Sequence, residues 1–206
     1  TITDETGKET FAGAIGDIAC FSFFPSKNMA VGGEGGMITT SKQHYAERLN
    51  SIVNHGRSSR IEAQQLGSNL RMSEVSAAIG SVQLSNLDNW LQRRRNIATR
   101  YLQECGDNVK LMMPKVRENC QHAWHQFCIL VEDEVAFCQH MDEELIDARV
   151  HYPIPCHKQP VFSDHPQHNV NMTTTDSISN KLVAIPIFHE MRDDEIDRVI
   201  SALNSY

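Results

Sequence analysis

The sequence predicts an α/β fold, because strand-like and helix-like segments alternate along the chain. Two apolar strand-like runs stand at residues 18–24 and 37–40. A helical pattern of apolar residues then extends from about residue 73 to residue 104. After Gly106, short strand candidates alternate with helical stretches, which is typical of a small α/β domain.

The first strand candidate follows a polar, glycine-containing segment, residues 1–15, which we expect to form a loop or a short strand. The run 18–24 ends before Pro25, which has no N–H to donate to a neighbouring strand. Lys27 follows at once, and four glycines stand between it and the second run, 37–40. The pattern therefore predicts a lysine held between a buried strand and a glycine-rich loop.

Two helices are predicted in the middle of the chain. The first covers residues 41–54, with Ser41 as its N-cap residue. The polar segment 55–70 is expected to be an exposed loop. The second helix takes Ser73 as its N-cap residue. Because that helix is long for a globular protein, we expect it to bend near Asn86 or to break into two helices.

The C-terminal part of the sequence carries the remaining elements. Strands are predicted at residues 109–112, 124–131, 149–152 and 183–187, and helices at residues 134–148 and 192–204. The strand–helix–strand alternation resembles a βαβ arrangement. We expect two domains, one of residues 1–106 and a smaller α/β domain of residues 107–206.

Length, charge and cysteine usage limit the class of protein. A chain of 206 residues can bury a sizeable core. Its formal net charge of −7 argues against nucleic acid or an anionic membrane as a partner, since both attract a basic face. The sequence shows neither an apolar run long enough for a transmembrane helix nor a secretory signal peptide. The six cysteines are scattered without a CxxC motif, so we expect reduced thiols in a cytoplasmic protein.

A cluster of potential metal ligands lies in the second half of the chain. Its members are Cys120, His122, His125 and Cys128. Structural zinc sites need paired ligands on short loops, and this spacing differs from theirs. The sequence therefore predicts no metal site.

Lys27 is the strongest candidate for a catalytic residue. A lysine at the end of an apolar strand can be desolvated, and desolvation favours the neutral amine. A neutral amine can attack a carbonyl carbon to form a Schiff base. Taken alone, the lysine is also compatible with an ordinary solvated side chain, because most lysines are exposed.

Three segments of the chain resemble motifs of one protein family. Residues 16–40 read GDIACFSFFPSKNMAVGGEGGMITT, residues 67–74 read GSNLRMSE, and residues 151–160 read HYPIPCHKQP. They resemble segments of the sugar aminotransferases called the DegT/DnrJ/EryC1/StrS family, which are fold-type I enzymes that use pyridoxal 5′-phosphate (PLP). The resemblance implies the C-terminal portion of such a fold, with the end of the large PLP domain followed by the small α/β domain.

The resemblance implies roles for three residues at a PLP site. Lys27 would form the Schiff base with the cofactor and move the proton between cofactor and substrate carbons. Ser22 would hydrogen-bond the cofactor phosphate, and its alternative is a serine tolerated in a half-buried strand. Asn69 would reach the phosphate of the neighbouring subunit's cofactor, which implies a homodimer with shared sites. The alternative for Asn69 is a loop residue that only precedes a helix.

The loop at residues 151–160 is implied to approach the substrate sugar. Tyr152 and His157 are the residues that we assign to that contact, because loops present side chains that packing does not need. In the alternative interpretation, His151 and Tyr152 pack at the end of a strand.

The implied reaction moves an amino group, usually from glutamate, to a nucleotide-linked keto-sugar and yields an amino sugar. In the related sugar 3-dehydratases the lysine position is typically a histidine, so Lys27 favours amination.

One departure from the family pattern concerns the start of the chain. Members of the family normally carry a long segment before the lysine, which supplies an acid for the pyridine nitrogen and an aromatic side chain that stacks on the ring. We therefore expect this sequence to be part of a longer protein or a natural fragment. The alternative function is a catalytically inactive C-terminal fragment that serves as an interaction or dimerisation module.

Overall fold

The computed structural model describes residues 1–166 and 170–206. The chain separates into two compact units. The first unit consists of residues 1–90 and 116–122, and the second of residues 91–115 and 123–206. Helix α2 (Glu74–Glu104) contributes to both units. The domain boundary that the sequence suggests near residue 106 stays a prediction.

The first unit begins with a small hairpin. Strand β1 (Ile2–Thr3) pairs antiparallel with β2 (Glu9–Thr10), and the 3-10 helix η1 (Ala12–Ala14) follows. The later segment 116–122 joins this hairpin, because the N–H of Thr3 donates to the carbonyl of Asn119 at 2.8 Å. The polar segment at the start of the chain therefore forms a short strand pair. The sequence predicted either a loop or a short strand there, and the strand is the one observed.

The two strand-like runs on either side of the lysine form one antiparallel pair. Strand β3 (Ala19–Ser22) pairs with β4 (Gly36–Thr39), and Ser22 lies opposite Gly36. A Cβ atom at Gly36 would lie 2.8 Å from the carbonyl oxygen of Phe21, so the pairing requires glycine there. The predicted strands are confirmed, although β3 stops before Phe23.

Helix α1 (Gln43–Ile52) follows β4, and its start differs from the prediction. Lys42, not Ser41, occupies the N-cap position, and no side chain caps the helix. The prediction of Ser41 as the N-cap residue is therefore wrong. The hydroxyl of Thr40, two residues before the N-cap, instead accepts a hydrogen bond from the Lys42 N–H at 3.1 Å.

Helix α2 (Glu74–Glu104) begins as the sequence predicts. The hydroxyl of Ser73 accepts a hydrogen bond from the Ser76 N–H at 3.1 Å, which confirms Ser73 as the cap. The helix is continuous over its whole length, so the expectation of two helices is wrong, while the expected bend near Asn86 stays a prediction. No proline interrupts it, and the side-chain amide of Asn86 donates to the Val82 carbonyl at 2.9 Å within the helix.

The second unit contains a four-stranded sheet with the order β5-β6-β8-β7. Its strands are β5 (Leu111–Met112), β6 (Phe127–Val131), β7 (Arg149–Val150) and β8 (Leu182–Ile185). Every neighbouring pair is antiparallel. Helix α3 (Glu134–Glu143) connects β6 to β7, and β8 lies between these two strands. The predicted βαβ-like alternation is thus a split unit, in which an antiparallel strand separates two parallel ones.

Helix α3 ends earlier than the predicted residue 148. Its N-cap residue Asp133 accepts a hydrogen bond from the Ala136 N–H at 2.9 Å. Leu145 has a φ of 57°, in the left-handed region, which an α-helix cannot continue through. The turn at Leu145 therefore brings the chain back toward β7.

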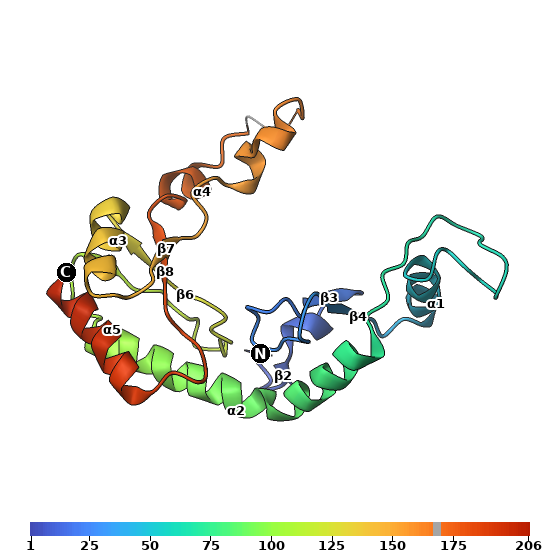
Figure 1. Cartoon of the computed structure of the whole chain (residues 1–206), viewed down its shortest axis with the longest axis horizontal. Helices are drawn as coiled ribbons and strands as arrows, with labels where there is room; N and C mark the ends of the chain where they lie inside the picture. The colour runs from blue at the N-terminus through green and yellow to red at the C-terminus, as the bar shows by residue number, and fades with distance from the viewer. Residues whose placement is uncertain (167–169) are drawn as a thin grey trace. The chain divides into compact units, whose positions relative to one another are not determined.

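Helix α5 (Asp193–Ser205) closes the second unit and lies alongside the C-terminal part of α2 (Figure 1). Arg100 on α2 donates to the carboxylate of Asp197 on α5 at 2.9 Å. The core between the helices and the sheet is apolar, and its fully buried members include Ile97, Tyr101, Phe127, Ile129, Phe137, Met141, Val183, Ile196 and Leu203.

One charged side chain lies inside this core. Arg94 is only 4% exposed, and its Nη1 donates to the carbonyls of Trp124 at 3.0 Å and Ile187 at 2.8 Å. Desolvation lowers the pKa of the Arg94 guanidinium from its usual value. The residue therefore ties α2 to the segments before β6 and after β8.

In the described part of the segment between β7 and β8 there are three short helices. They are the 3-10 helices η2 (Cys156–Lys158) and η3 (Pro160–Phe162) and the α-helix α4 (Thr173–Ile178). Among the helices of the described residues, none is long and apolar enough to cross a bilayer.

Candidate active site

Lys27 lies directly after the β3–β4 pair, on a turn. The Phe23 N–H donates to the Gly35 carbonyl at 2.8 Å and continues the strand pairing by one residue. The Lys27 N–H then donates to the Phe24 carbonyl at 2.9 Å, which closes the turn that contains Pro25. Lys27 is half-buried. The backbone therefore holds the lysine at a strand end, as the sequence predicts. The prediction that this strand is buried is wrong, because Cys20, Phe21 and Ser22 of β3 are exposed.

The glycine-rich segment after Lys27 packs against the first part of α2. Val31 is fully buried, and the Ala30 N–H donates to the side chain of Gln83 at 2.8 Å. A Cβ atom at Gly35 would lie 2.5 Å from the Val31 side chain and 2.9 Å from the Met72 sulfur. Glycine at position 35 thus permits the close approach of this segment to Val31 and Met72.

Ser22 is the last residue of β3 and is exposed. Its hydroxyl oxygen accepts a long hydrogen bond, 3.4 Å, from the Phe24 N–H. Because the oxygen accepts this bond, the hydroxyl proton is directed elsewhere and can be given to another acceptor. Ser22 is thus the last residue of β3, and Lys27 lies on the turn that follows, five residues later in the sequence.

Asn69 lies near the end of the exposed 55–70 loop, where its backbone bridges to Asn54. Arg71 holds both side chains: its Nε donates to the Asn69 Oδ1 at 3.1 Å, and its Nη1 donates to the Asn54 Oδ1 at 3.2 Å. With Oδ1 engaged, the amide Nδ2 of Asn69 remains as a hydrogen-bond donor. The motif at residues 67–74 showed Asn69, whereas nothing in the sequence pattern showed that Asn54 shares the same arginine.

The base of the 55–70 loop is tightly closed. Gly56 has a φ of 72°, and a Cβ atom there would lie 1.7 Å from the Gln65 carbonyl oxygen. The loop nevertheless carries two almost fully exposed apolar side chains, Ile61 at 93% and Leu66 at 96%. Its base is therefore fixed, and its outer part presents apolar surface.

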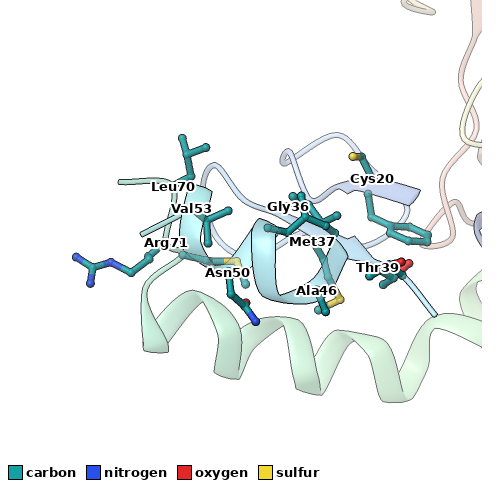
Figure 2. Close-up of a pocket in the computed structure, with 14 residues that line it drawn as sticks. Cys20, Gly36, Met37, Thr39, Ala46, Asn50, Val53, Leu70 and Arg71 are labelled. Atoms are coloured by element: carbon teal, nitrogen blue, oxygen red, sulfur yellow. The ribbon is translucent and has the colours of Figure 1, made fainter. Parts of the chain in front are cut away.

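A groove of about 770 Å³ lies beside the β3–β4 pair in the first unit. Strand β4, helix α1 and residues 70–72 line it, and Figure 2 shows the Arg71 side chain pointing away from the other labelled residues. The described residues that line this groove do not include Lys27, Ser22 or Asn69. This groove is therefore not the predicted lysine site.

Tyr152 and His157 belong to the second unit. Tyr152 is 67% exposed and follows His151, whose N–H donates to the Leu182 carbonyl at 2.8 Å on β8. The His151 ring contacts the side-chain amide of Gln126. The backbone thus places Tyr152 one residue beyond the sheet, where its ring lies against the His151 ring with 3.9 Å between the two centroids. This contact agrees with the alternative of packing at the strand end, although most of the Tyr152 side chain still faces solvent.

His157 and Lys158 both contact Asp176 on α4. The His157 Nε2 lies 3.1 Å from the Asp176 Oδ1, and the Lys158 Nζ lies 2.9 Å from the same oxygen. The hydrogen bond from Lys158, together with the charge of Lys158 and the hydrogen bond from the Met172 N–H, holds the pKa of Asp176 below its usual value. One nitrogen of the His157 ring is therefore committed to Asp176. Sequence reasoning did not identify Asp176.

The sequence predicts no metal site, and this stays a prediction. Within residues 1–166 and 170–206, no three His, Cys, Asp or Glu side chains gather closely enough to hold a metal ion.

Comparison with known proteins identifies a family for nearly the whole chain. Residues 4–204 match the model of the DegT/DnrJ/EryC1/StrS aminotransferase family. The chain is 40% identical over 194 residues to a protein of Aneurinibacillus thermoaerophilus named dTDP-3-amino-3,6-dideoxy-alpha-D-galactopyranose transaminase, covering 94% of this chain and 53% of the relative. It is 29% identical to a Streptomyces venezuelae protein named dTDP-3-amino-3,4,6-trideoxy-alpha-D-glucose transaminase, covering 94% of this chain and 51% of the relative.

Solved structures show the same fold. The S. venezuelae protein DesV superposes with a TM-score of 0.88 at 29% identity, over 92% of this chain and 52% of DesV. NtdA of Bacillus subtilis, solved with the cofactor PMP bound, superposes with a TM-score of 0.86 at 26% identity, over 95% of this chain and 47% of NtdA. The chain thus spans about half the length of the relatives that it matches.

Proposed function

Because the chain belongs to the DegT/DnrJ/EryC1/StrS aminotransferase family, whose cofactor is PLP, we propose that it is the C-terminal part of a sugar aminotransferase. The proposed reaction moves the amino group of glutamate to a nucleotide-linked keto-sugar, which yields 2-oxoglutarate and an amino sugar. Two relatives named as dTDP-sugar transaminases support the substrate class. The observation that carries the proposal is Lys27, half-buried on a turn at the end of β3.

The residues of the first unit fit PLP by their chemistry. A phosphate needs hydrogen-bond donors, and the Ser22 hydroxyl and the Asn69 Nδ2 are both donors on exposed backbone. An aldehyde needs a primary amine, which Lys27 supplies. When bound, PLP supplies an electron sink for the substrate carbon that loses its proton.

In this proposal Lys27 has two tasks. Its Nζ would hold the cofactor covalently in the resting enzyme, and the released amine would carry the proton between cofactor and substrate carbons. The strand end and the glycine-rich segment that packs on α2 limit the motion of the lysine backbone, so Nζ returns to one position.

Asn69 is proposed to act in the partner subunit of a homodimer, on the phosphate of the partner's cofactor. The 55–70 loop supports this because it presents Ile61, Leu66 and Leu70 to solvent, and a second copy would cover them. Within such a dimer, residues 1–106 would belong to the large cofactor domain and residues 107–206 to the small domain. The free thiols favour a reducing compartment, and we place the enzyme in the cytoplasm.

Tyr152 and His157 are proposed to contact the sugar nucleotide from the 151–160 loop. Tyr152 has an exposed hydroxyl that can donate and accept, which suits sugar hydroxyls. His157 keeps one ring nitrogen beyond its contact with Asp176. The alternative of a catalytically inactive interaction module is not favoured, because the relatives are named as transaminases.

The two half-reactions test this function separately. The natural polypeptide that contains this chain is incubated with PLP, freed of excess cofactor and mixed with glutamate, and 2-oxoglutarate is measured. We expect one equivalent per active site without a keto-sugar, and continuous turnover with one. Protein that binds PLP but forms no 2-oxoglutarate from glutamate would contradict the proposed donor, and a panel of other amino acids would then define it.

A further inference from the structure

Asp176 gathers three contacts at one carboxylate. Its Oδ1 accepts from the His157 Nε2 at 3.1 Å and from the Lys158 Nζ at 2.9 Å, and its Oδ2 accepts from the Met172 N–H at 3.4 Å. The side chains of His157 and Asp176 are 13% and 22% exposed, so water competes little for their contact. The carboxylate therefore joins the 151–160 loop to α4 and to the residue that precedes α4.

Among the described residues, the space between the loop and α4 is otherwise open. A groove of about 720 Å³ lies there, and its walls are mainly apolar: Pro153, Ile154 and Pro155 on the loop, and Met172, Ile178 and Leu182 opposite. An unfilled groove means that side-chain packing does little to fix the loop at this place. Pro153 and Pro155 also lack N–H groups, so they cannot donate to neighbouring backbone. The polar contact at Asp176 thus becomes the more important restraint.

A short series of contacts leads from Asp176 back to Tyr152. The Lys158 N–H donates to the Pro155 carbonyl at 2.9 Å, which forms the η2 turn next to His157. The Gln159 side chain then donates to the Ile154 carbonyl at 3.1 Å, across the loop. Ile154 is two residues from Tyr152, whose other side is held by the bond from His151 to Leu182.

We propose that Asp176 is a positioning residue for the 151–160 loop, which acts through His157 and Lys158 to hold Tyr152 where the sugar nucleotide binds. This proposal rests on the proposed function, because it takes the loop as a substrate contact. Asp176 touches neither the cofactor nor the reacting atoms. It determines how much of the loop's ordering is complete before substrate arrives, and therefore how tightly substrate is bound.

The test uses two variants and one matched control in the natural polypeptide that contains this chain. Asp176→Ala removes all three contacts. Asp176→Asn keeps the shape and one acceptor but loses the charge that attracts Lys158. Asp194→Asn is the control, because it neutralises an exposed aspartate in an ion pair with Arg192 at 3.0 Å, outside the loop. Thermal melts and PLP absorbance establish that each variant is folded and loaded.

The half-reactions separate this proposal from the proposed function. The substrate probes are dTDP- and UDP-linked amino sugars run in the reverse direction, and the one that gives the largest response with the unsubstituted protein is used. We expect Asp176→Ala to raise the KM for that sugar nucleotide by about fivefold or more and Asp176→Asn to raise it less, with the glutamate half-reaction unchanged. The Asp194→Asn control should match the unsubstituted protein.

A second measurement does not depend on activity. Hydrogen exchange of residues 151–160 should be faster in Asp176→Ala than in the control, and exchange in β6 and β8 should be unchanged. Equal KM values in Asp176→Ala and the control would overturn the proposal, as would a parallel loss in both half-reactions, which indicates a general structural role. Failure of the glutamate half-reaction in the unsubstituted protein would instead count against the proposed function, and the exchange experiment would still decide whether Asp176 orders the loop.

Discussion

Arg71 donates from Nε to the Oδ1 of Asn69 at 3.1 Å, and this bond decides which end of the Asn69 amide is available to a ligand. Because Oδ1 is engaged, the available end is Nδ2, a donor that suits a phosphate and repels a cation. Arg71 also binds Asn54, so it restrains the two chain segments that close the 55–70 loop.

The first prediction concerns this arginine. Arg71→Ala should weaken PLP binding by about two- to tenfold, because a hydrogen bond of this kind contributes about 0.5–1.5 kcal/mol. The measurement is a PLP titration followed by absorbance. Arg60→Ala is the matched control, since it removes the same charge from an exposed residue of the 55–70 loop, which Arg71 follows. If both variants lose affinity equally, general electrostatic attraction explains the effect and the orientation of Asn69 does not.

The second prediction separates a phosphate contact of Ser22 from simple strand packing. A hydroxyl that donates to a phosphate contributes about 1.5–3 kcal/mol, so Ser22→Ala should weaken PLP binding by about ten- to a hundredfold. Ser81→Ala is the control, because that hydroxyl bonds the Ala77 carbonyl within α2 at 3.0 Å. Unchanged PLP affinity in Ser22→Ala would assign the residue to the strand alone.

The third prediction tests whether Asn69 acts across a dimer. Lys27→Ala and Asn69→Ala proteins should each be inactive or nearly so. Mixed after dissociation, they should recover about a quarter of the wild-type activity, because half of a random mixture is hybrid and one site of each hybrid is intact. Hybrids that form, as mass spectrometry would show, without any recovered activity would place Asn69 in its own subunit or outside the site.

The fourth prediction concerns the stability of the second unit. Arg94→Leu leaves the buried carbonyls of Trp124 and Ile187 without their donor, which costs about 1–3 kcal/mol for each. Urea unfolding should therefore show a lower free energy of unfolding. Arg149→Leu serves as the control, since its ion pair with Asp147 is exposed. A midpoint for Arg94→Leu that equals the control's would show that these bonds add no net stability.

Local signals in the sequence predicted much of this structure. Ser73 caps α2, and Pro25 lies in the turn between β3 and Lys27, because each effect acts over a few neighbouring residues. The prediction of Ser41 as the N-cap of α1 was wrong, because the N-cap position is occupied by Lys42. The early end of α3 was not predicted either, and it is visible only in the left-handed backbone of Leu145. Helix caps and ends depend on packing that a single sequence does not display.

In the candidate site, too, residues in contiguous motifs could be predicted, and residues brought together only by the tertiary structure could not. Lys27, Ser22 and Asn69 lie in motifs of contiguous residues and could be found by reading along the chain. Asp176 lies nineteen positions from His157, and no periodicity connects the two residues. The contact exists because α4 folds back on the 151–160 loop, which only the tertiary structure reveals.

The central claim is that Lys27 binds PLP covalently, and borohydride trapping tests it most directly. The natural polypeptide that contains this chain is loaded with PLP, reduced with borohydride, digested and analysed by mass spectrometry. We predict that the reduced cofactor is found on the peptide that contains Lys27, and that Lys27→Ala protein of unchanged thermal stability carries none there. Cofactor on a different lysine, or none at all on unsubstituted protein saturated with PLP, would contradict the account.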